Sequence, residues 1–334
     1  MYYNNNSFKS IKTPTYKVKV SIIIPNYNHF NFLEERLQCI FNQSFTDFEM
    51  IILDDYSTDN SVSVLNQYTS HPKVKHCIFN SLNSGSTFIQ WKKGLELAKG
   101  EFIWIAESDD FSNFDFLKEM VALLEEHEHA GLAYCQSYIV DENSNILRQN
   151  FEWTDDLDTS RWGAEYVNNG IAEISNYLSK KCTIPNASAV LIRKSAINLE
   201  DIRIDFKKMG DWYLWISILK KYDVVYTPKP LNYFRETTYS TRVLDTLPKL
   251  INYYEEKIEI LYYLNTILNS NKTHVQEEIV KMITEYVDVN TIKNILRSNL
   301  YRKKIFFNDF LLIHSLIIKK LDFKKIMFRY LLIK

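Results

Sequence analysis

The sequence predicts an α/β fold: a Rossmann-like, mostly parallel sheet flanked by helices, with a helical C-terminal region after it. Short apolar runs rich in β-branched residues alternate with amphipathic segments of helical length, which is typical of a doubly wound parallel sheet. The chain has 334 residues, of which 46% are hydrophobic and 24% charged, so it can bury a large core. From about residue 245 helical periodicity replaces the alternation, and we place a domain boundary near 244.

The first half of the chain contains four expected strands. Residues 1–17 are polar, carry no acidic residue and are predicted to be a disordered lead-in. Pro25 ends the first strand in a turn, and Gly100 ends the helix before the fourth strand. The expected elements are strands 18–24, 49–53, 74–79 and 101–105 and helices 32–41, 59–68 and 86–99.

The second half is expected to extend the same sheet. Pro228 and Pro230 are predicted to end a strand, because proline cannot donate to a strand ladder. Residues 151–163 are expected to form a loop. The other expected elements are helix 113–128, strands 131–140, 187–193 and 224–226, and a helix that begins at Gly210.

Composition excludes several classes of protein. The seven glycines lie apart, so no glycine-rich loop can hold a phosphate, and a metal or basic side chains would have to do so. A net charge of -1 gives no reason to expect a nucleic-acid partner. The four cysteines form no C-x-x-C pair, which favours reduced thiols over zinc. Without a signal peptide or a run of about 18 apolar residues, the chain is expected in the cytoplasm.

Four polar clusters follow predicted strands, at residues 25–28, 54–59, 83–85 and 107–110. Ligands of such sheets bind beyond the carboxyl ends of the strands, where all four clusters fall. In the last cluster Glu107, Asp109 and Asp110 crowd three carboxylates that repel one another unless a cation lies among them. Mg²⁺ or Mn²⁺ with diphosphate oxygens is the expected occupant, and a solvated acidic turn is the alternative.

Other candidate residues have two interpretations each. Asp54 and Asp55 can accept hydrogen bonds from a base or from sugar hydroxyls, whereas the segment around them can also simply cap a helix. Asp211 stands at a helix start, where an aspartate is more often a cap than a base on residue type alone. Lys92 or Lys93 can contact a phosphate, although a helical lysine is usually solvated.

Four segments together resemble family 2 of the inverting glycosyltransferases over about residues 18–240. They are VSIIIPNYN at 20–28, QSFTDFE at 43–49, LDDYSTD at 53–59, and AKGEFI at 98–103 leading into Ser108, Asp109 and Asp110. The resemblance implies the A-type glycosyltransferase fold, a nucleotide-diphosphate sugar as donor, and Mn²⁺ or Mg²⁺ as cofactor. It also divides residues 18–244 into a nucleotide-binding half, 18–111, and an acceptor-binding half, 112–244.

Residue roles follow from the same resemblance. Pro25 and Asp55 match positions that hold the nucleoside, while Asp109 and Asp110 match the D-x-D region that holds ribose, metal and diphosphate. The segment around Asp211 matches the one that supplies the catalytic base. The expected donor-binding residues are Pro25, Asn26, Tyr27, Asp54, Asp55, Asn83, Lys92, Glu107, Ser108 and Asp109, the metal ligands are Asp109 and Asp110, and the catalytic residue is Asp211.

The expected function is a metal-dependent, inverting sugar transfer to an acceptor hydroxyl, in surface polysaccharide or lipid-linked glycan assembly. Two positions depart from the family pattern: Glu107 stands where Asp usually opens the D-x-D region, and Glu236 stands where many relatives carry a His. A sugar nucleotidyltransferase is the alternative, although it normally needs a glycine-rich basic loop after its first strand. A catalytically inactive sugar-nucleotide-binding protein is the other alternative.

Two features bear on the acceptor. Residues 301–334 carry nine Lys or Arg against two acidic residues, interleaved with apolar ones. This suits an amphipathic helix on the inner face of the cell membrane, near a lipid-linked acceptor, or equally a helix packed on the catalytic domain. Acceptor choice is expected in residues 140–190 and around Trp212, where aromatic side chains such as Trp153, Trp162 and Tyr166 can stack on sugar rings or belong to the core.

Overall fold

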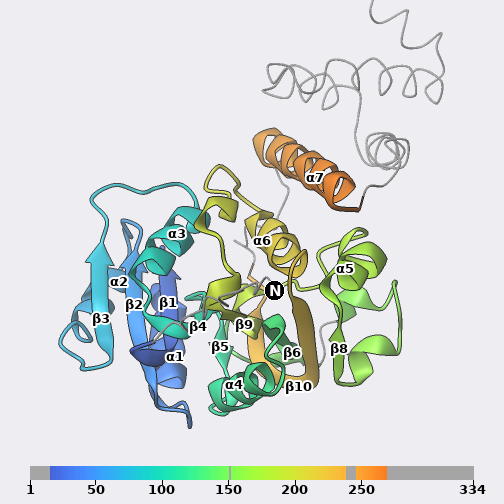
Figure 1. Cartoon of the computed structure of the whole chain (residues 1–334). Helices are drawn as coiled ribbons and strands as arrows, with labels where there is room; N and C mark the ends of the chain where they lie inside the picture. The colour runs from blue at the N-terminus through green and yellow to red at the C-terminus, as the bar shows by residue number, and fades with distance from the viewer. Residues whose placement is uncertain (1–15, 150–151, 238–245, 269–334) are drawn as a thin grey trace, which may run out of the picture.

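The computed structural model describes residues 16–149, 152–237 and 246–268 (Figure 1). They form a ten-stranded sheet in the order β3-β2-β1-β4-β9-β6-β10-β5, with β7 paired to β6 and β8 to β10. The strands are β1 Val18–Asn26, β2 Phe48–Asp54, β3 Val74–Phe79, β4 Gly100–Ile105, β5 Phe111–Ser112, β6 Ala130–Val140, β7 Ile146–Arg148, β8 Tyr166–Asn168, β9 Val190–Arg193 and β10 Asp223–Arg235.

The helices flank this sheet. Those described are α1 Phe30–Phe41, α2 Ser61–Asn66, α3 Thr87–Leu97, α4 Phe116–Glu126, α5 Gly170–Glu173, α6 Gly210–Leu219 and α7 Leu247–Leu268. The predicted lead-in, except for its last two residues, and the predicted membrane segment 301–334 lie outside the described residues, and the predicted boundary near 244 falls in an undescribed gap. Among the described helices, none combines the length and the hydropathy needed to cross a membrane.

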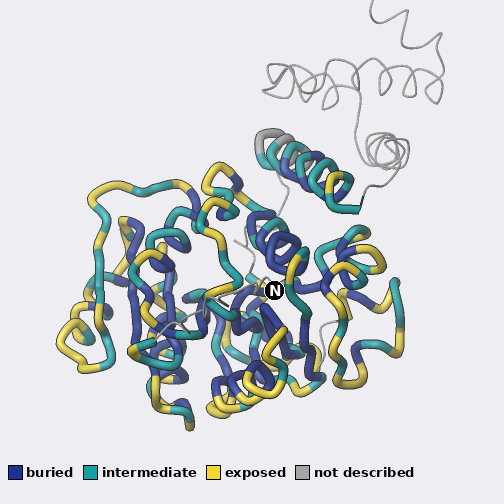
Figure 2. Tube along the Cα trace, in the orientation of Figure 1, coloured by how far each residue is buried: buried dark blue, intermediate teal, exposed yellow. Residues whose placement is uncertain are grey.

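The expected mostly parallel sheet is confirmed. Strands β1 to β4 pair in parallel, as do β6 and β10, and the antiparallel β9 joins the two groups. Central strand β1 is apolar on both faces because both are covered: Ile23 packs with α3 and α6, whereas Ile22 and Ile24 pack with α1 and α4. Figure 2 shows the resulting buried sheet between more exposed helices and loops.

The prediction that Pro228 and Pro230 end a strand at Tyr226 is wrong. Strand β10 continues through both prolines to Arg235. Its register against β6 shifts on either side of Pro230, so irregularities in the ladder accommodate the residues that lack an N–H. The continuation matters for the site, because it carries Arg235 to the end of β4.

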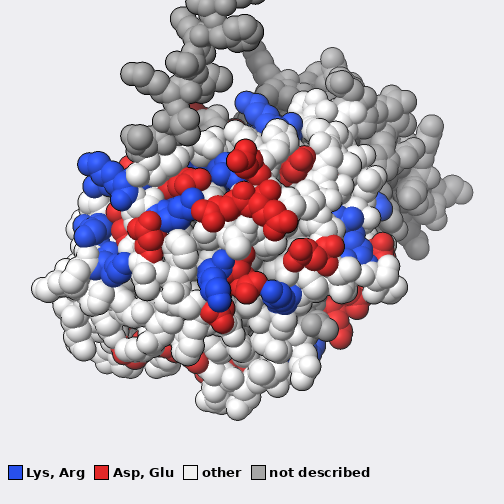
Figure 3. All heavy atoms as spheres, turned by 60° about the horizontal axis from the view of Figure 1, so that its bottom comes forward, with Lys and Arg blue, Asp and Glu red and all other residues white. Residues whose placement is uncertain are grey.

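Charges of both signs lie on the face of the molecule shown in Figure 3, where Asp and Glu side chains gather near the centre with Lys and Arg around them. Ion pairs such as Lys19–Glu125 and Lys229–Glu119 join elements far apart in the sequence. This mixed face is unlike the continuous basic surface that binds a phosphate backbone.

Helix α3 packs so closely on the sheet that one of its positions requires glycine. A Cβ at Gly94 would lie 2.4 Å from Cγ2 of Ile23 on β1, whereas a Cβ at Gly163 would have no atom within 4 Å. The helix therefore rests directly on the central strand.

We expect Gly94→Ala to lower the free energy of unfolding by about 1–3 kcal/mol, because the added methyl overpacks the core. Urea denaturation followed by circular dichroism would measure this change. The matched control Gly163→Ala should stay within about 0.5 kcal/mol of the parent protein. Equal stability of the two variants would contradict the close packing of α3.

Candidate active site

Three carboxylates lie in the loop of residues 107–110, which follows β4 and is called the carboxylate loop here. Trp91 Nε1 donates to Glu107 Oε1 at 2.7 Å. Asn186 Nδ2 donates to Asp110 Oδ2 at 2.9 Å, and the backbone N–H of Arg235 donates to Asp110 Oδ1 at 3.0 Å. Within the described part of the chain, no hydrogen bond reaches the partly exposed carboxylate of Asp109. Asp109 therefore has the carboxylate best placed to receive a ligand.

Crowding raises the proton affinity of this loop. Burial, with a contribution from the neighbouring charge of Asp109, raises the pKa of Glu107 to about 8. The same two causes raise the pKa of Asp110, which is buried. Desolvation and like-charge repulsion both raise the pKa of a carboxyl group. A cation among these groups would lower the pKa of Glu107 and of Asp110.

Two buried arginines brace the carboxylate loop. Arg36 on α1 donates from Nε to the carbonyl oxygen of Glu107 at 2.8 Å and from an Nη to Ser188 Oγ at 3.1 Å. Arg235 at the end of β10 donates from Nε to the carbonyl oxygen of Asp109 at 2.8 Å. Their side chains are almost completely buried, so both positive charges lie inside the protein close to the carboxylates.

Arg235 also connects the carboxylate loop to two other elements. One Nη donates to the carbonyl oxygen of Asp141 at 2.7 Å, and the other donates to Glu35 Oε2 at 2.6 Å and Ser144 Oγ at 3.1 Å. The guanidinium lies over the ring of Phe32, 4.5 Å from its centroid. One side chain thus joins β4, α1 and the β6–β7 turn.

Hydrogen bonds of short polar side chains hold the β1–α1 and β2–α2 loops together. Asp54 accepts from Asn26 Nδ2 at 2.8 Å and from Ser57 Oγ at 2.6 Å. Asn28, in the left-handed region with φ 56°, accepts at Oδ1 from the N–H of Thr58 at 2.7 Å. These bonds leave Tyr27 45% exposed beside a rigid turn.

Asp55 is the centre of a second network. Its Oδ1 accepts from Asn80 Nδ2 at 2.7 Å and Gln90 Nε2 at 2.8 Å, and its Oδ2 accepts from Ser84 Oγ at 2.7 Å. Asn83 Nδ2 donates to the backbone oxygen of Asp55 at 2.9 Å. These partners occupy most acceptor positions of the carboxylate, so Asp55 holds the β3–α3 loop in place in this structure. Its expected contact with the nucleoside stays a prediction.

The remaining predicted residues are arranged around these networks. Pro25 is buried at the end of β1, and Ser108 Oγ lies 2.8 Å from His29 Nδ1. Lys92 has no hydrogen bond or ion pair to any described residue, whereas its neighbour Lys93 donates to Asn80 Oδ1 at 2.7 Å. The lysine that contacts the Asp55 network is therefore Lys93.

Asp211 lies in the first turn of α6, where its Oδ1 accepts from the N–H of Trp212 at 2.7 Å. A Cβ at the preceding Gly210 would lie 2.8 Å from the ring of Phe88 on α3. Phe88 meets Trp91 edge-on with ring centroids 5.0 Å apart, and Trp91 donates to Glu107. A short chain of contacts therefore links the start of α6 to the carboxylate loop.

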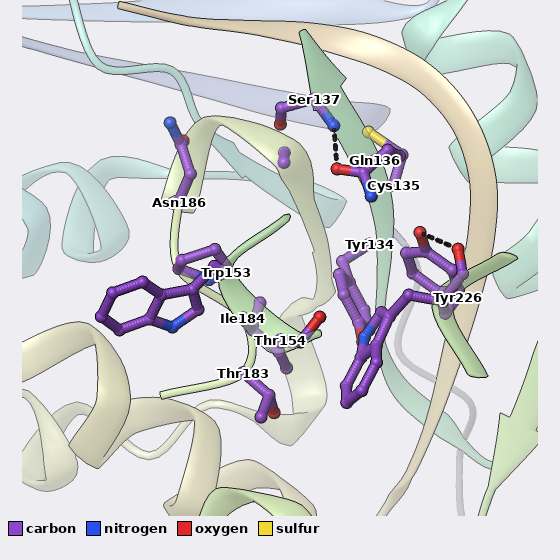
Figure 4. A pocket seen from close by; sticks show the side chains of 13 residues that line it. Tyr134, Cys135, Gln136, Ser137, Trp153, Thr154, Thr183, Ile184, Asn186 and Tyr226 are labelled. Carbon is purple, nitrogen blue, oxygen red and sulfur yellow. Dashed lines mark hydrogen bonds between the residues drawn. The ribbon is translucent and has the colours of Figure 1, made fainter. Parts of the chain in front are cut away.

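A small pocket opens beside the carboxylate loop, and Asn186 belongs to its wall (Figure 4). Trp162 and Tyr166 are inward-facing: Trp162 Nε1 donates to the Tyr134 hydroxyl at 2.8 Å, and the Tyr166 hydroxyl bonds to the same group. Trp153 instead is 45% exposed and donates from Nε1 to the Cys182 carbonyl at 2.7 Å. Of the three aromatic candidates, Trp153 presents an exposed ring.

Sequence reasoning missed several residues of this site. Arg36 had a detectable signal, because it stands among Leu33, Leu37 and Ile40 on the buried face of an amphipathic helix, where an unpaired charge is costly. Gln90 had a similar signal on α3. Arg235, Asn186 and Ser188 had none, since each reaches the carboxylate loop from a distant part of the chain.

Comparison with known proteins defines the family. The model of Glycosyl transferase family 2 matches residues 21–198, more than half of the chain. The chain therefore belongs to glycosyl transferase family 2.

Three curated relatives illustrate the similarity. Poly(ribitol-phosphate) beta-N-acetylglucosaminyltransferase TarS of Staphylococcus aureus is 33% identical over 112 residues, covering 33% of this chain and 19% of TarS. The putative teichuronic acid biosynthesis glycosyltransferase TuaG of Bacillus subtilis is 33% identical over 115 residues, 34% of this chain and 45% of TuaG. An uncharacterized glycosyltransferase of Haemophilus influenzae is 24% identical over 84% of both chains. The first two similarities thus span less than half of those relatives.

Solved structures agree on the fold. The crystal structure of S. aureus TarS residues 1–349 in complex with UDP-GlcNAc matches with a TM-score of 0.61 at 18% identity, over 84% of this chain and 79% of that chain. The form of the same TarS region in complex with UDP matches with a TM-score of 0.58 at 18% identity, over 81% and 76% of the two chains. The expected A-type glycosyltransferase fold is confirmed.

Replacing Arg235 with Met should lower the free energy of unfolding by at least about 2 kcal/mol, because the buried carbonyls of Asp109 and Asp141 lose their donor. Urea denaturation would measure the loss. Arg148→Met is the matched control: it removes an exposed ion pair with Glu236 and should cost less than about 1 kcal/mol. A cost no larger than the control's would contradict the bracing role of Arg235.

Proposed function

We propose that this protein is a metal-dependent inverting glycosyltransferase that moves a sugar from a nucleotide-diphosphate sugar to an acceptor hydroxyl. The observation that carries the proposal is the carboxylate of Asp109, which is partly exposed and receives no hydrogen bond from a described residue, in a loop braced by two buried arginines. Family membership supports a nucleotide-sugar donor, since a TarS structure was solved with UDP-GlcNAc.

The residues present fit Mn²⁺ or Mg²⁺ held jointly with a diphosphate. The described residues contain no cluster of three or more His, Cys, Asp or Glu side chains that could cage an ion alone. Mg²⁺ is commonly bound by one or two carboxylates together with substrate phosphates, which matches Asp109 with Asp110 beside it. Such an ion would stabilise negative charge on the leaving nucleoside diphosphate.

The other predicted donor-site residues keep their assignments in this proposal. Asn26, Tyr27 and Asp54 border the nucleoside position, and Asn83 forms part of the loop held by Asp55. In this proposal Glu107 supports the site by accepting a hydrogen bond from Trp91, and it does not bind the donor directly. The phosphate contact proposed for Lys92 is the least supported, because it is Lys93 that bonds to Asn80.

Asp211 would act as the general base. It stands on α6, across the Phe88–Trp91 contact from the carboxylate loop, so the base and the donor-binding carboxylates come from separate elements. Asp211 would take the proton of the acceptor hydroxyl as that oxygen attacks the anomeric carbon. A single displacement with no covalent sugar intermediate inverts the configuration.

The proposed acceptor is a glycan or polyol-phosphate chain in surface polysaccharide assembly, free or lipid-linked. Two relatives support this class by their names, which specify poly(ribitol-phosphate) and teichuronic acid biosynthesis. Trp153 at the edge of the small pocket is partly exposed, with Lys181 Nζ 4.3 Å from its ring centroid, and the part of the ring left open can contact such a chain. The cytoplasmic placement and the membrane contact of residues 301–334 stay predictions.

A donor screen tests the reaction class. The full chain is incubated with UDP-hexoses and UDP-N-acetylhexosamines, Mn²⁺ and poly(ribitol-phosphate), and the released nucleotide is identified by chromatography. We expect a nucleoside diphosphate and a product of inverted anomeric configuration by NMR. In a parallel incubation with UTP and sugar 1-phosphates, pyrophosphate release would instead indicate a nucleotidyltransferase. Donor binding without any turnover across the screen would indicate an inactive binding protein.

Asp211→Asn should reduce kcat by about 100-fold or more while leaving the donor KM nearly unchanged, because only the proton acceptor is lost. Steady-state release of nucleoside diphosphate measures both constants. Asp201→Asn, in the segment before α6, is the control and should retain parental turnover. Unchanged kcat in the Asp211 variant would remove this residue from the mechanism.

Asp109→Asn should abolish most of the gain in donor affinity that Mn²⁺ provides, because the amide is a poor ligand for a hard cation. Isothermal titration of UDP with and without Mn²⁺ gives this difference for the parent and the variant. The control Asp115→Asn alters an exposed carboxylate bonded to Ser44 and should keep the metal response. An identical metal response in all three proteins would refute the role of Asp109.

A further inference from the structure

A buried carboxylate from α7 contacts the segment directly before α6. Glu256 Oε1 accepts from the backbone N–H of Lys207 at 2.6 Å, and its Oε2 accepts from those of Lys208 at 3.0 Å and Met209 at 2.8 Å. The residue is 5% exposed. One side chain therefore holds three successive backbone donors.

These donors have no other described cap. The first N–H groups of a helix lack partners within the helix, and Met209, at the N-cap position of α6, makes no capping bond with its side chain. Glu256 supplies an acceptor for the N–H of Met209 from a different helix, and it also accepts from Lys207 and Lys208, which lie just before α6. A negative charge there also complements the positive end of the α6 dipole.

Further contacts fix α7 against α6, beside which it lies in Figure 1. Tyr263 on α7 stacks on Tyr213 of α6 with ring centroids 4.4 Å apart, and its hydroxyl lies 3.0 Å from Ser217 Oγ. Ile260 and Leu264 of α7 belong to the same buried cluster as α6. The packing of α7 on α6 therefore sets the position of Glu256.

The same segment is tied on its other side to the donor-binding half. Ser86 Oγ donates to the carbonyl oxygen of Phe206 at 2.7 Å, and Lys207 Nζ donates to that of Gly85 at 2.7 Å. Residues 206–209 are therefore held between the β3–α3 loop and Glu256. Asp211 lies only two residues after Met209, the last residue of this segment.

We propose that Glu256 is a positioning residue that sets the place of Asp211 relative to the bound donor. The proposal rests on the proposed function in its assignment of Asp211 as the base. It makes α7, which lies beyond the segment matched by the family model, a required part of the active site. Glu256 acts through the backbone of residues 207–209 and touches neither donor nor acceptor.

The kinetic test uses Glu256→Gln in the full chain, with UDP release as the assay. A misplaced base lowers the chemical rate without weakening donor binding, so kcat should fall by about 10- to 100-fold while the donor KM stays within about twofold. In the Asp211→Asn background the same substitution should cause no further loss, because coupled residues are not additive. An equal loss in both backgrounds would overturn the proposal.

Glu259→Gln is the matched control on the same helix. Glu259 pairs with Arg203, whereas the backbone N–H groups of residues 207–209 bond to Glu256, so kcat should stay at the parental value. Glu256→Asp is the second variant, which retains the charge on a shorter side chain and should recover part of the lost kcat. The proposal would be wrong if Glu256→Asp recovered no kcat and Glu259→Gln lost as much kcat as Glu256→Gln. In that case α7 would stabilise the fold without positioning the base.

Hydrogen–deuterium exchange provides a measurement that needs no activity. The amides of residues 207–209 should exchange at least about tenfold faster in Glu256→Gln than in the parent or in Glu259→Gln, since their acceptor is weakened. Unchanged exchange would overturn the proposal even if kcat fell. If no donor gave turnover in the parent protein, the proposed function would fail, and the exchange data would still decide whether Glu256 holds this segment.

Discussion

The site depends on how two buried guanidinium groups hold a loop of three carboxylates. An uncompensated buried charge is costly, and neighbouring carboxylates repel one another. Arg36 and Arg235 bond to carbonyl oxygens of this loop from different elements, α1 and β10, and the charge of Arg36 lowers the pKa of Glu107 and Asp110 against the effect of burial. These bonds hold the backbone of the loop and leave the carboxylate of Asp109 partly exposed, as the proposed metal and diphosphate contact requires.

The loops that follow β1, β2 and β3, where the donor is proposed to bind, are also held by side-chain hydrogen bonds. The chain has only seven glycines, so its loops do not wrap phosphates with bare backbone. Instead, short side chains such as Asn28, Asp54 and Asp55 accept hydrogen bonds from neighbouring loops. Each loop is stabilised by the next, and the carboxyl ends of β1, β2 and β4 form one connected polar edge.

The proposed catalytic side is built differently, from helices that the family match does not reach. The family model ends at residue 198, whereas α6 with Asp211 and α7 with Glu256 follow it. Phe88 packs on Gly210 from the donor side, while Glu256 holds the preceding backbone from the other side. The position of the proposed base is therefore determined jointly by both halves of the protein.

The sequence by itself determined the order and type of most of the longer elements, because apolar periodicity and strand-end turns are local signals, whereas the short elements β5, β7, β8 and α5 were not predicted. It also identified the clusters around Asp55 and Asp109 from their spacing. It could not determine that β10 continues through Pro230, because that depends on register against β6. Tertiary structure alone decided that Arg235 bonds to the carboxylate loop and that Glu256 bonds to the segment before α6, since each contacts a segment remote in sequence. Burial and pairing of charge depend on the three-dimensional arrangement, and no local pattern encodes them.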